Sequence, residues 1–421
     1  MSAPAASAGG GERIGTTEMT ENVNDDTIGA DLIALRRRLH RIPEVGLDLP
    51  LTQAALLEEL RGLPVTITTG RGFSWLAVAI EGAAPGPTVL LRSDMDALPV
   101  VEETGLEYAS DNGAMHACGH DLHMAALVGA IRVLCARRDE LAGTVLAVFQ
   151  PGEEGYDGAS LMIQEGVLEL TGSRPVASYG MHVFSFLPAG EFSCRPGTIM
   201  AGTLNFELEV IGKGGHAARP AGARNPLIVA SLVVQAIQGY ATQNNRTDDP
   251  IIATVGSLVG GTAPNVIPER ALLRISLRAL TRERLSRLFE DVVGLARSIA
   301  EGYGQEIAVS AGPQLPPTVS SDGEDAFVEG AVLDLFGPGR YRSLPVAEMI
   351  SEDFSYFLEA TGGAFLFLGA AVPTTGEAPA TNHSPVVRFD DSVVADGALL
   401  LAELALRRLA SGGPADVPGA G

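Results

Sequence analysis

The sequence predicts an α/β protein with a mostly parallel mixed sheet, interrupted by an inserted α+β domain that contains an antiparallel sheet and two helices. In the first half, short apolar runs that end in acidic residues flank a long apolar segment of helical length. From about residue 200, apolar and polar residues alternate instead. The length of 421 residues also fits two domains better than one. We expect one domain over 27–200 and 315–410, and a second over 201–314.

The first predicted element is a helix that begins near Thr27. Apolar residues recur at helical spacing at Ile28, Leu32, Leu35 and Leu39. Residues 1–26 before it are mostly small and polar, so we expect a disordered tail there. We expect a flexible tail at 411–421 as well.

Two apolar runs in the first domain, at 89–91 and 145–149, predict buried strands. Between them, the apolar segment 121–141 predicts a well-buried helix. Strand, helix and strand in this order indicate a parallel sheet, and ligands bind at the carboxyl ends of such strands. A pair of acids follows each run at that end: Asp94 and Asp96, then Glu153 and Glu154.

The second domain is predicted from four segments. Alternating patterns indicate half-buried antiparallel strands at 204–210 and 273–277. Apolar helices are expected at about 226–240 and 282–300, covering one face of that sheet. A loop rich in proline and glycine follows, and "GGAFLFLGAA" then predicts a strand of the first domain.

The composition excludes several classes of protein. With 46% hydrophobic and 19% charged residues, the chain can bury a sizeable core and is not globally disordered. Its net charge of −22 disfavours binding to nucleic acid or anionic membrane, and no apolar run is long enough to span a bilayer. The cysteines are odd in number, with no signal peptide before them, so we expect a cytoplasmic protein without disulfides.

The stretch "MHACGHDLH", residues 115–123, concentrates groups that can carry chemistry. Cys118 and His120 can converge from a loop before the helix, and thiolate and imidazole are ligands that zinc prefers. Cys118 could instead be a nucleophile, with His116 or His120 as base and Asp121 as the orienting group. Burial among other polar residues is the third interpretation, and it is the favoured one for His116 and His123.

The stretch "FQPGEE" favours the metal interpretation. Two adjacent glutamates at the end of a buried strand can divide two roles, because one can hold a metal while the other acts as a general base. An exposed acidic turn is the alternative. His182 and His383 follow apolar segments elsewhere, and together these groups would be enough for two metals.

At this point the motifs resemble a known family. "RSDMDALP", "MHACGHDLH", "FQPGEEG", "MHV", "GKGGHAARP", "GTAPNVIP", "SEDF" and "NHSP" occur in the order found in metal-dependent amidohydrolases. These include hippurate hydrolase, indole-acetyl-amino-acid hydrolases and N-acetyl-diaminopimelate deacetylase, which share a di-metal exopeptidase-like fold. The resemblance covers residues from about 30 to about 405.

The resemblance implies a two-metal centre, with zinc, manganese, cobalt or nickel as the divalent ions. Its ligands would be Cys118, His120, Glu154, His182 and His383. Glu153 would be the general base, and Asp96 would orient a ligand without binding the metal. Asp94 is then expected to be structural.

The resemblance further implies that the inserted domain is a lid and dimerisation domain. His216 of "GGHAA" would reach the active site of the partner subunit in a homodimer and stabilise an oxyanion there. Asn265 and Arg278 match positions that hold the substrate carboxylate, although Arg278 is interpreted equally well as an exposed strand cation. The loop after His216 departs from the family pattern, so we expect it to alter the acyl pocket.

The implied activity is hydrolysis of the amide bond of a small-molecule N-acyl amino acid. A dipeptidase or aminopeptidase with the same centre is the alternative within enzymes. A catalytically silent binding protein is the alternative outside them, and the presence of both Glu153 and Glu154 argues against it.

Overall fold

The computed structural model describes residues 26–373 and 378–413, so the predicted tails at 1–26 and 411–421 lie almost wholly outside it. The helices are α2 (Asp26–His40), α3 (Pro50–Glu59), α4 (His120–Ala136), α5 (Gly158–Gln164), α6 (Pro226–Asn244), α7 (Arg282–Gly302), α8 (Glu324–Phe336), α9 (Ser355–Thr361) and α10 (Val393–Ser411). Short 3₁₀ turns occur at Arg138–Glu140, Val167–Glu169 and Pro220–Gly222. None of the helices in the described ranges is long and apolar enough to cross a lipid bilayer.

An eight-stranded mixed sheet forms the centre of the first domain. In spatial order its strands are β1 (Thr66–Thr69), β2 (Leu76–Glu81), β4 (Ala142–Gln150), β3 (Ala84–Asp94), β5 (Pro175–Phe184), β16 (Gly363–Gly369), β6 (Phe192–Cys194) and β15 (Tyr341–Ser343). The four central strands β4, β3, β5 and β16 pair in parallel. Their carboxyl ends therefore meet at one edge of the sheet, as the sequence predicts.

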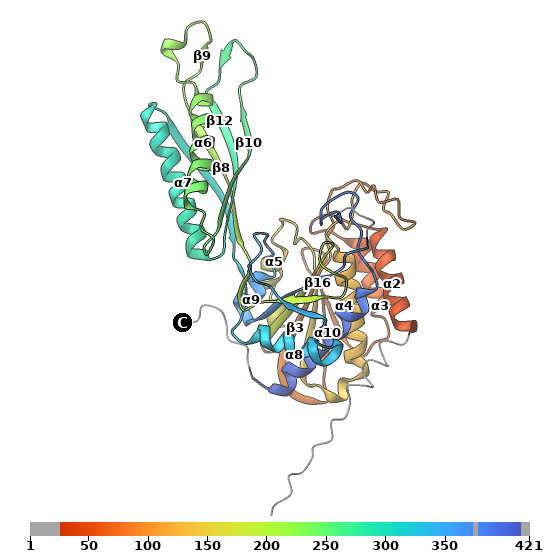
Figure 1. The fold of residues 1–421 in the computed structure, drawn as a ribbon. Helices are drawn as coiled ribbons and strands as arrows, with labels where there is room; N and C mark the ends of the chain where they lie inside the picture. Colours follow the sequence, from red (N-terminus) through yellow and green to blue (C-terminus); the bar gives the residue numbers. More distant parts are fainter. Residues whose placement is uncertain (1–25, 374–377, 414–421) are drawn as a thin grey trace, which may run out of the picture.

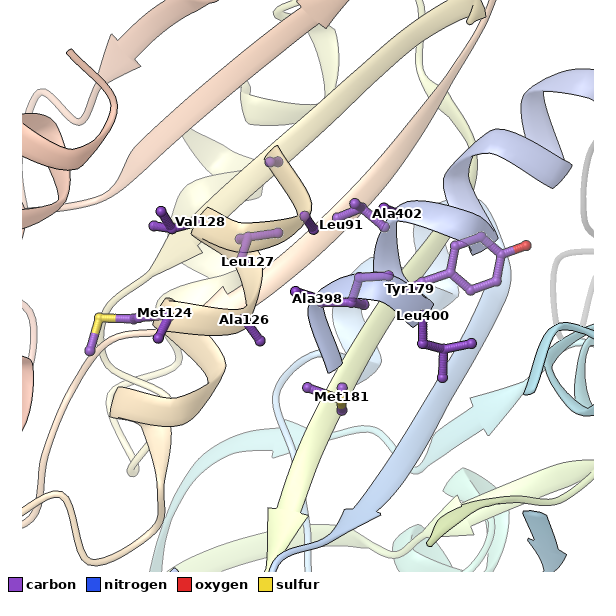
Figure 2. Close-up of a cluster of buried hydrophobic side chains, with 14 of the residues drawn as sticks. Leu91, Met124, Ala126, Leu127, Val128, Tyr179, Met181, Ala398, Leu400 and Ala402 are labelled. Carbon is purple, nitrogen blue, oxygen red and sulfur yellow. The ribbon is translucent and has the colours of Figure 1, made fainter. Parts of the chain in front are cut away.

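Helices cover both faces of this sheet. Val89 and Leu91 on β3 face a core shared with α2, α4 and α10, whereas Leu90 between them faces a second core shared with α5 and α9. This alternation explains why the strand is apolar without interruption. Figure 2 shows Leu127 of α4 and Leu400 of α10 within the first of these cores.

The inserted domain has its own core. Its sheet runs in the order β10 (Ile251–Gly260), β12 (Arg270–Ala279), β8 (Gly202–Ile211) and β13 (Glu306–Leu315), all antiparallel. Leu208, Leu273 and Val292 belong to the core that α6 and α7 form against one face of this sheet. The α/β fold with an inserted antiparallel domain is thus confirmed.

Two paired strands connect the domains. The chain leaves the first domain through β7 (Gly197–Met200) and returns through β14 (Thr318–Ser320), and these strands pair antiparallel with Met200 opposite Thr318. Beyond this connection the inserted domain, green to teal in Figure 1, projects away from the rest of the molecule. Its far end carries β9 (Gly215–His216), which pairs with β11 (Val266–Ile267).

We expect Leu127→Ala to lower the free energy of unfolding of the first domain by about 2–5 kcal/mol, because Leu127 is fully buried and its neighbours cannot fill the space. Urea unfolding followed by circular dichroism measures the change. The control Leu170→Ala removes a side chain that is 40% exposed, and it should change this free energy by less than about 0.5 kcal/mol. Equal losses in the two variants would contradict the packing described here.

Candidate metal centre

Side chains from separate segments converge beyond the carboxyl ends of the parallel strands. Cys118 Sγ lies 3.3 Å from His182 Nε2 and 3.2 Å from His383 Nε2. His383 Nε2 in turn lies 3.3 Å from Glu154 Oε1. Cys118, His120 and His182 also each offer one ligand atom within 4.8 Å of the others. The structure therefore brings together the five residues predicted as ligands.

The donors of this cluster fit a transition metal. The Nδ1–H of His120 donates to the Asp96 carbonyl oxygen at 2.8 Å. Nε2 of the same ring is buried and has no hydrogen-bond partner among the described residues. A buried nitrogen is rarely left unpaired, and a cation would satisfy it. Thiolate, imidazole and carboxylate together suit zinc and its neighbours in the divalent series.

Asp96 controls the position of the glutamate pair. Its Oδ1 accepts the backbone N–H of Glu153 and its Oδ2 accepts that of Glu154, both at 3.0 Å. The same residue holds the His120 ring through its backbone carbonyl. Asp96 therefore has the geometry of a positioning residue, which is the role that the resemblance implies for it.

A glycine sets the path of the chain between Cys118 and His120. Gly119 has φ +90°, and a Cβ atom there would lie 2.4 Å from Val183 Cγ2. Only glycine combines this left-handed conformation with so close an approach to β5. We expected both neighbours to lie in a loop, but His120 is already the first residue of α4 while Cys118 occupies the preceding turn.

His383 also has a restricted backbone. Its φ of +72° is unusual for a residue with a side chain. Its N–H donates to the carbonyl oxygen of Ala117 at 2.8 Å, which ties this distant segment to the turn that carries Cys118. Strained residues of this kind persist where surrounding contacts fix them, and they cluster at functional sites.

Crowding of acidic groups shifts the ionisation of the site. Burial, with the nearby Glu154 and Glu153 carboxylates, raises the pKa of Cys118 well above its ordinary value. Burial likewise raises the pKa of Glu153, helped by Glu352 and Glu154. Burial alone would lower the pKa of His120, but Asp94 and Asp96 raise it to about 10. Such surroundings disfavour a free thiolate nucleophile at Cys118 and favour a bound cation.

Asp121 does not act as expected. In the nucleophile interpretation it would orient His116 or His120, but its side chain hydrogen-bonds to neither ring. It is instead buried against Arg36, whose Nε lies 2.8 Å from Oδ2, and His40, whose Nδ1 lies 2.7 Å away. Buried carboxylates need such partners, and this requirement decides its orientation.

The two remaining histidines of the stretch are both buried, but they differ in their hydrogen bonds. His123 donates through Nδ1 to Asp94 Oδ1 at 2.6 Å and accepts the Val183 N–H on Nε2 at 2.8 Å, so both nitrogens are satisfied. His116 is equally buried, yet neither of its ring nitrogens has a hydrogen-bond partner among the described residues. Burial lowers the pKa of His116 to about 3, which keeps the ring neutral.

Sequence reasoning missed a buried ionic network behind Glu153. The guanidinium of Arg92 donates to Gln150 Oε1 at 2.8 Å, Asp94 Oδ2 at 2.6 Å, Glu352 Oε1 at 2.9 Å and Asp353 Oδ1 at 3.1 Å. Burial raises the pKa of Glu352 to about 8, against the effect of Arg92. The signals were present, because an arginine inside an apolar strand and the "SEDF" acids both require buried partners.

The cluster opens into a cavity of about 800 Å³ lined by Cys118, Glu153, His182 and His383. Arg278 reaches this cavity from β12. Its guanidinium donates to the Met349 carbonyl at 3.1 Å and to Ser351 Oγ at 3.2 Å. The alternative interpretation of Arg278 as an exposed strand cation is therefore wrong.

His216 and Asn265 lie elsewhere. Both are exposed at the tip of the inserted domain, where Ala217 N–H donates to the Asn265 carbonyl at 3.0 Å. Neither residue lines the cavity of its own chain, and Figure 1 shows β9 at the far end from the first domain. The loop at 217–225 shares this tip, so within one chain it does not shape the cavity as we expected.

Comparison with known proteins shows which family the chain belongs to. The model of peptidase family M20/M25/M40 matches residues 90–407. The chain is 35% identical over 391 residues to IAA-amino acid hydrolase ILR1-like 5 of Arabidopsis thaliana, covering 90% of this chain and 86% of that protein. It is 36% identical over 355 residues to N-acetyldiaminopimelate deacetylase of Streptococcus uberis, covering 82% and 91%. A crystal structure of a dinuclear metal-binding M20 peptidase from Bacillus subtilis superposes with a TM-score of 0.78 at 28% identity, covering 92% and 99%.

We expect Cys118→Ala to lose bound metal, because it removes the sulfur that lies within 3.3 Å of both His182 Nε2 and His383 Nε2. Elemental analysis after dialysis against zinc or manganese measures the content. Cys135→Ala is the matched control, since Cys135 is half-buried on α4 outside the cluster. Full occupancy in Cys118→Ala would remove the thiol from the ligand set.

Proposed function

We propose that this chain, a metal-dependent amidohydrolase that belongs to peptidase family M20/M25/M40, hydrolyses N-acyl amino acids to a free amino acid and a carboxylic acid. Glu153, Arg278 and four of the five candidate ligands line one cavity, with His120 grouped beside Cys118 and His182, and this convergence carries the proposal. The names of the relatives support it, because they include hydrolases of an acylated amino acid and a deacetylase.

Cys118, His120, Glu154, His182 and His383 would hold the divalent ions. When bound, these ions would polarise the amide carbonyl and lower the pKa of a water molecule. The cluster does not select among zinc, manganese, cobalt and nickel, because its donors suit each of them.

Glu153 is proposed as the general base. It takes a proton from the attacking water and returns that proton to the leaving amine, so it must hold the proton between the two steps. Asp96 holds the backbone at Glu153, so the carboxylate need not reorganise during the reaction.

Arg278 and Asn265 are proposed to grip the substrate carboxylate. A guanidinium can make two parallel hydrogen bonds to a carboxylate, and Arg278 presents its guanidinium within the cavity. Asn265 and His216 would come from the second copy of a homodimer, with His216 stabilising the oxyanion.

An unpaired strand edge supports the homodimer. β10 forms an edge of the inserted sheet and exposes Ile252, Leu258 and Val259. Exposed apolar edges invite pairing with another chain.

A reducing compartment such as the cytoplasm is proposed on separate grounds, since Cys118, Cys135 and Cys194 are all free thiols.

A dipeptidase or aminopeptidase is the second candidate. Glu348 lines the same cavity and forms no ion pair with the described residues. A carboxylate in this position could accept the α-ammonium group of a peptide.

A substrate panel separates the candidates. We expect metal-loaded protein to release amino acid from N-acetyl, N-benzoyl or indole-acetyl amino acids faster than from free dipeptides. Glu153→Gln should retain its metal yet lose about 10²-fold to 10⁴-fold in turnover, because the base is removed while the ligands stay. Near-normal activity in Glu153→Gln would exclude Glu153 as the base, and preference for dipeptides would favour the second candidate.

Mixing two inactive variants tests the role of His216. If His216 serves the other subunit, a dimer of one Glu153→Gln chain and one His216→Ala chain keeps one intact site. Random co-assembly should then recover about a quarter of wild-type activity, because half of the dimers are mixed and each has one working site. No recovery above the separate variants would place His216 outside the partner's site.

A further inference from the structure

The cavity beside the candidate metal centre has an aromatic wall. Phe184 stacks against the ring of His182 with centroids 4.8 Å apart, and Phe186 lies 5.2 Å beyond Phe184. Both phenylalanines line the cavity. The row of rings therefore starts at a candidate ligand and continues outward along the wall.

Local structure fixes this row. His182 and Phe184 are two residues apart on β5, so their side chains point to the same face. Phe367 of the neighbouring strand holds Phe184 from the side, with centroids 4.5 Å apart. Phe186 follows the end of the strand and is 46% exposed, so one ring of the row is left for a ligand to cover.

The inserted domain contributes polar residues to the same cavity. Thr203, Asn205 and Arg278 project into it from β8 and β12 of the inserted domain. Met200 and Ile350 add apolar surface near the connection between the domains. A volume of about 800 Å³ is much more than an acetyl group fills, and it lies in the range of pockets that bind drug-sized molecules.

We propose that Phe186, supported by Phe184, selects substrates whose acyl group is a planar aromatic one, such as benzoyl or indole-acetyl. This inference rests on the proposed amidohydrolase function and specifies its substrate class. Aromatic rings gain from offset or edge contacts with another ring beyond the burial of apolar area alone. An acetyl group is too small to reach a ring that stands beyond Phe184.

The position of this row of rings indicates that it contacts the acyl group of the substrate, not its amino acid part. With the substrate carboxylate on Arg278 of the inserted domain, the scissile carbonyl has to reach the cluster that contains His182. Phe184 covers the face of that histidine. The acyl group is attached to the carbonyl carbon, so it begins beside Phe184 and extends toward Phe186.

Steady-state kinetics of Phe186→Ala test the proposal on the full-length metal-loaded enzyme. The ratio of kcat/KM for N-benzoylglycine to that for N-acetylglycine should fall about tenfold, as expected for loss of an aromatic contact. Phe186→Leu should give an intermediate ratio, because it retains apolar volume without the ring. Leu170→Ala, exposed elsewhere on the first domain, should leave the ratio unchanged.

The proposal is overturned if Phe186→Ala changes both substrates equally or neither. It is also overturned if the variant alters discrimination between N-benzoylglycine and N-benzoylphenylalanine instead, because the row would then bind the amino acid side chain. Calorimetric binding of benzoate and acetate gives a readout without turnover. A wild-type enzyme that cleaves no N-acyl substrate contradicts the proposed function. Selective loss of benzoate binding in Phe186→Ala supports the aromatic subsite, and unchanged benzoate binding overturns the subsite.

Discussion

The candidate site depends on the hydrogen bonds of Asp96. Its two carboxylate oxygens hold the backbone of Glu153 and Glu154, and its carbonyl oxygen holds the ring of His120. One residue therefore fixes groups that arrive from β4 and from the start of α4. All three hydrogen bonds are made to Asp96, so a shift of this residue would move Glu153, Glu154 and His120 together. The precision of the centre thus comes from a side chain that itself has no predicted contact with the metal.

Much of the fold was predictable because it rests on local patterns. The uninterrupted apolar runs around Leu90 and Leu146 indicated buried strands, and the alternation from Leu204 to Val210 indicated a half-buried one. The acids at the strand ends indicated where chemistry would gather. These signals lie within single segments, so a reader of the sequence can find them.

Other features could not be predicted because they depend on contacts between distant segments. Asp121 has the position of a helix-starting residue, but Arg36 and His40 determine where its side chain lies. Arg92 meets Glu352 only after β3 and the segment before α9 have packed together. Likewise, the convergence of the five candidate ligands was predicted from the ordered motifs of a family. Residue spacing alone did not exclude the interpretation of Cys118 as a nucleophile.

The two walls of the cavity belong to different domains. The wall proposed to bind the acyl group lies on the first domain, and the residue proposed to bind the substrate carboxylate lies on the inserted domain. The wall with Phe184 moves with the candidate metal centre, since both are built on the first sheet. The wall with Arg278 moves with the inserted domain. Any change in the angle between the domains therefore alters the distance between the two ends of a bound substrate, with the β7 and β14 pair as the natural pivot.

The same β7 and β14 connection sets an order of folding during synthesis. Residues 202–315 form one continuous segment with a separate core, so this domain can fold as soon as it leaves the ribosome. The first domain cannot, because α4 packs on α10, and β5 pairs with β16, near the other end of the chain. Its amino-terminal half must stay open until those late elements arrive, with the apolar surface of α4 exposed meanwhile. The stage most exposed to aggregation is therefore expected to come before the candidate metal centre can form.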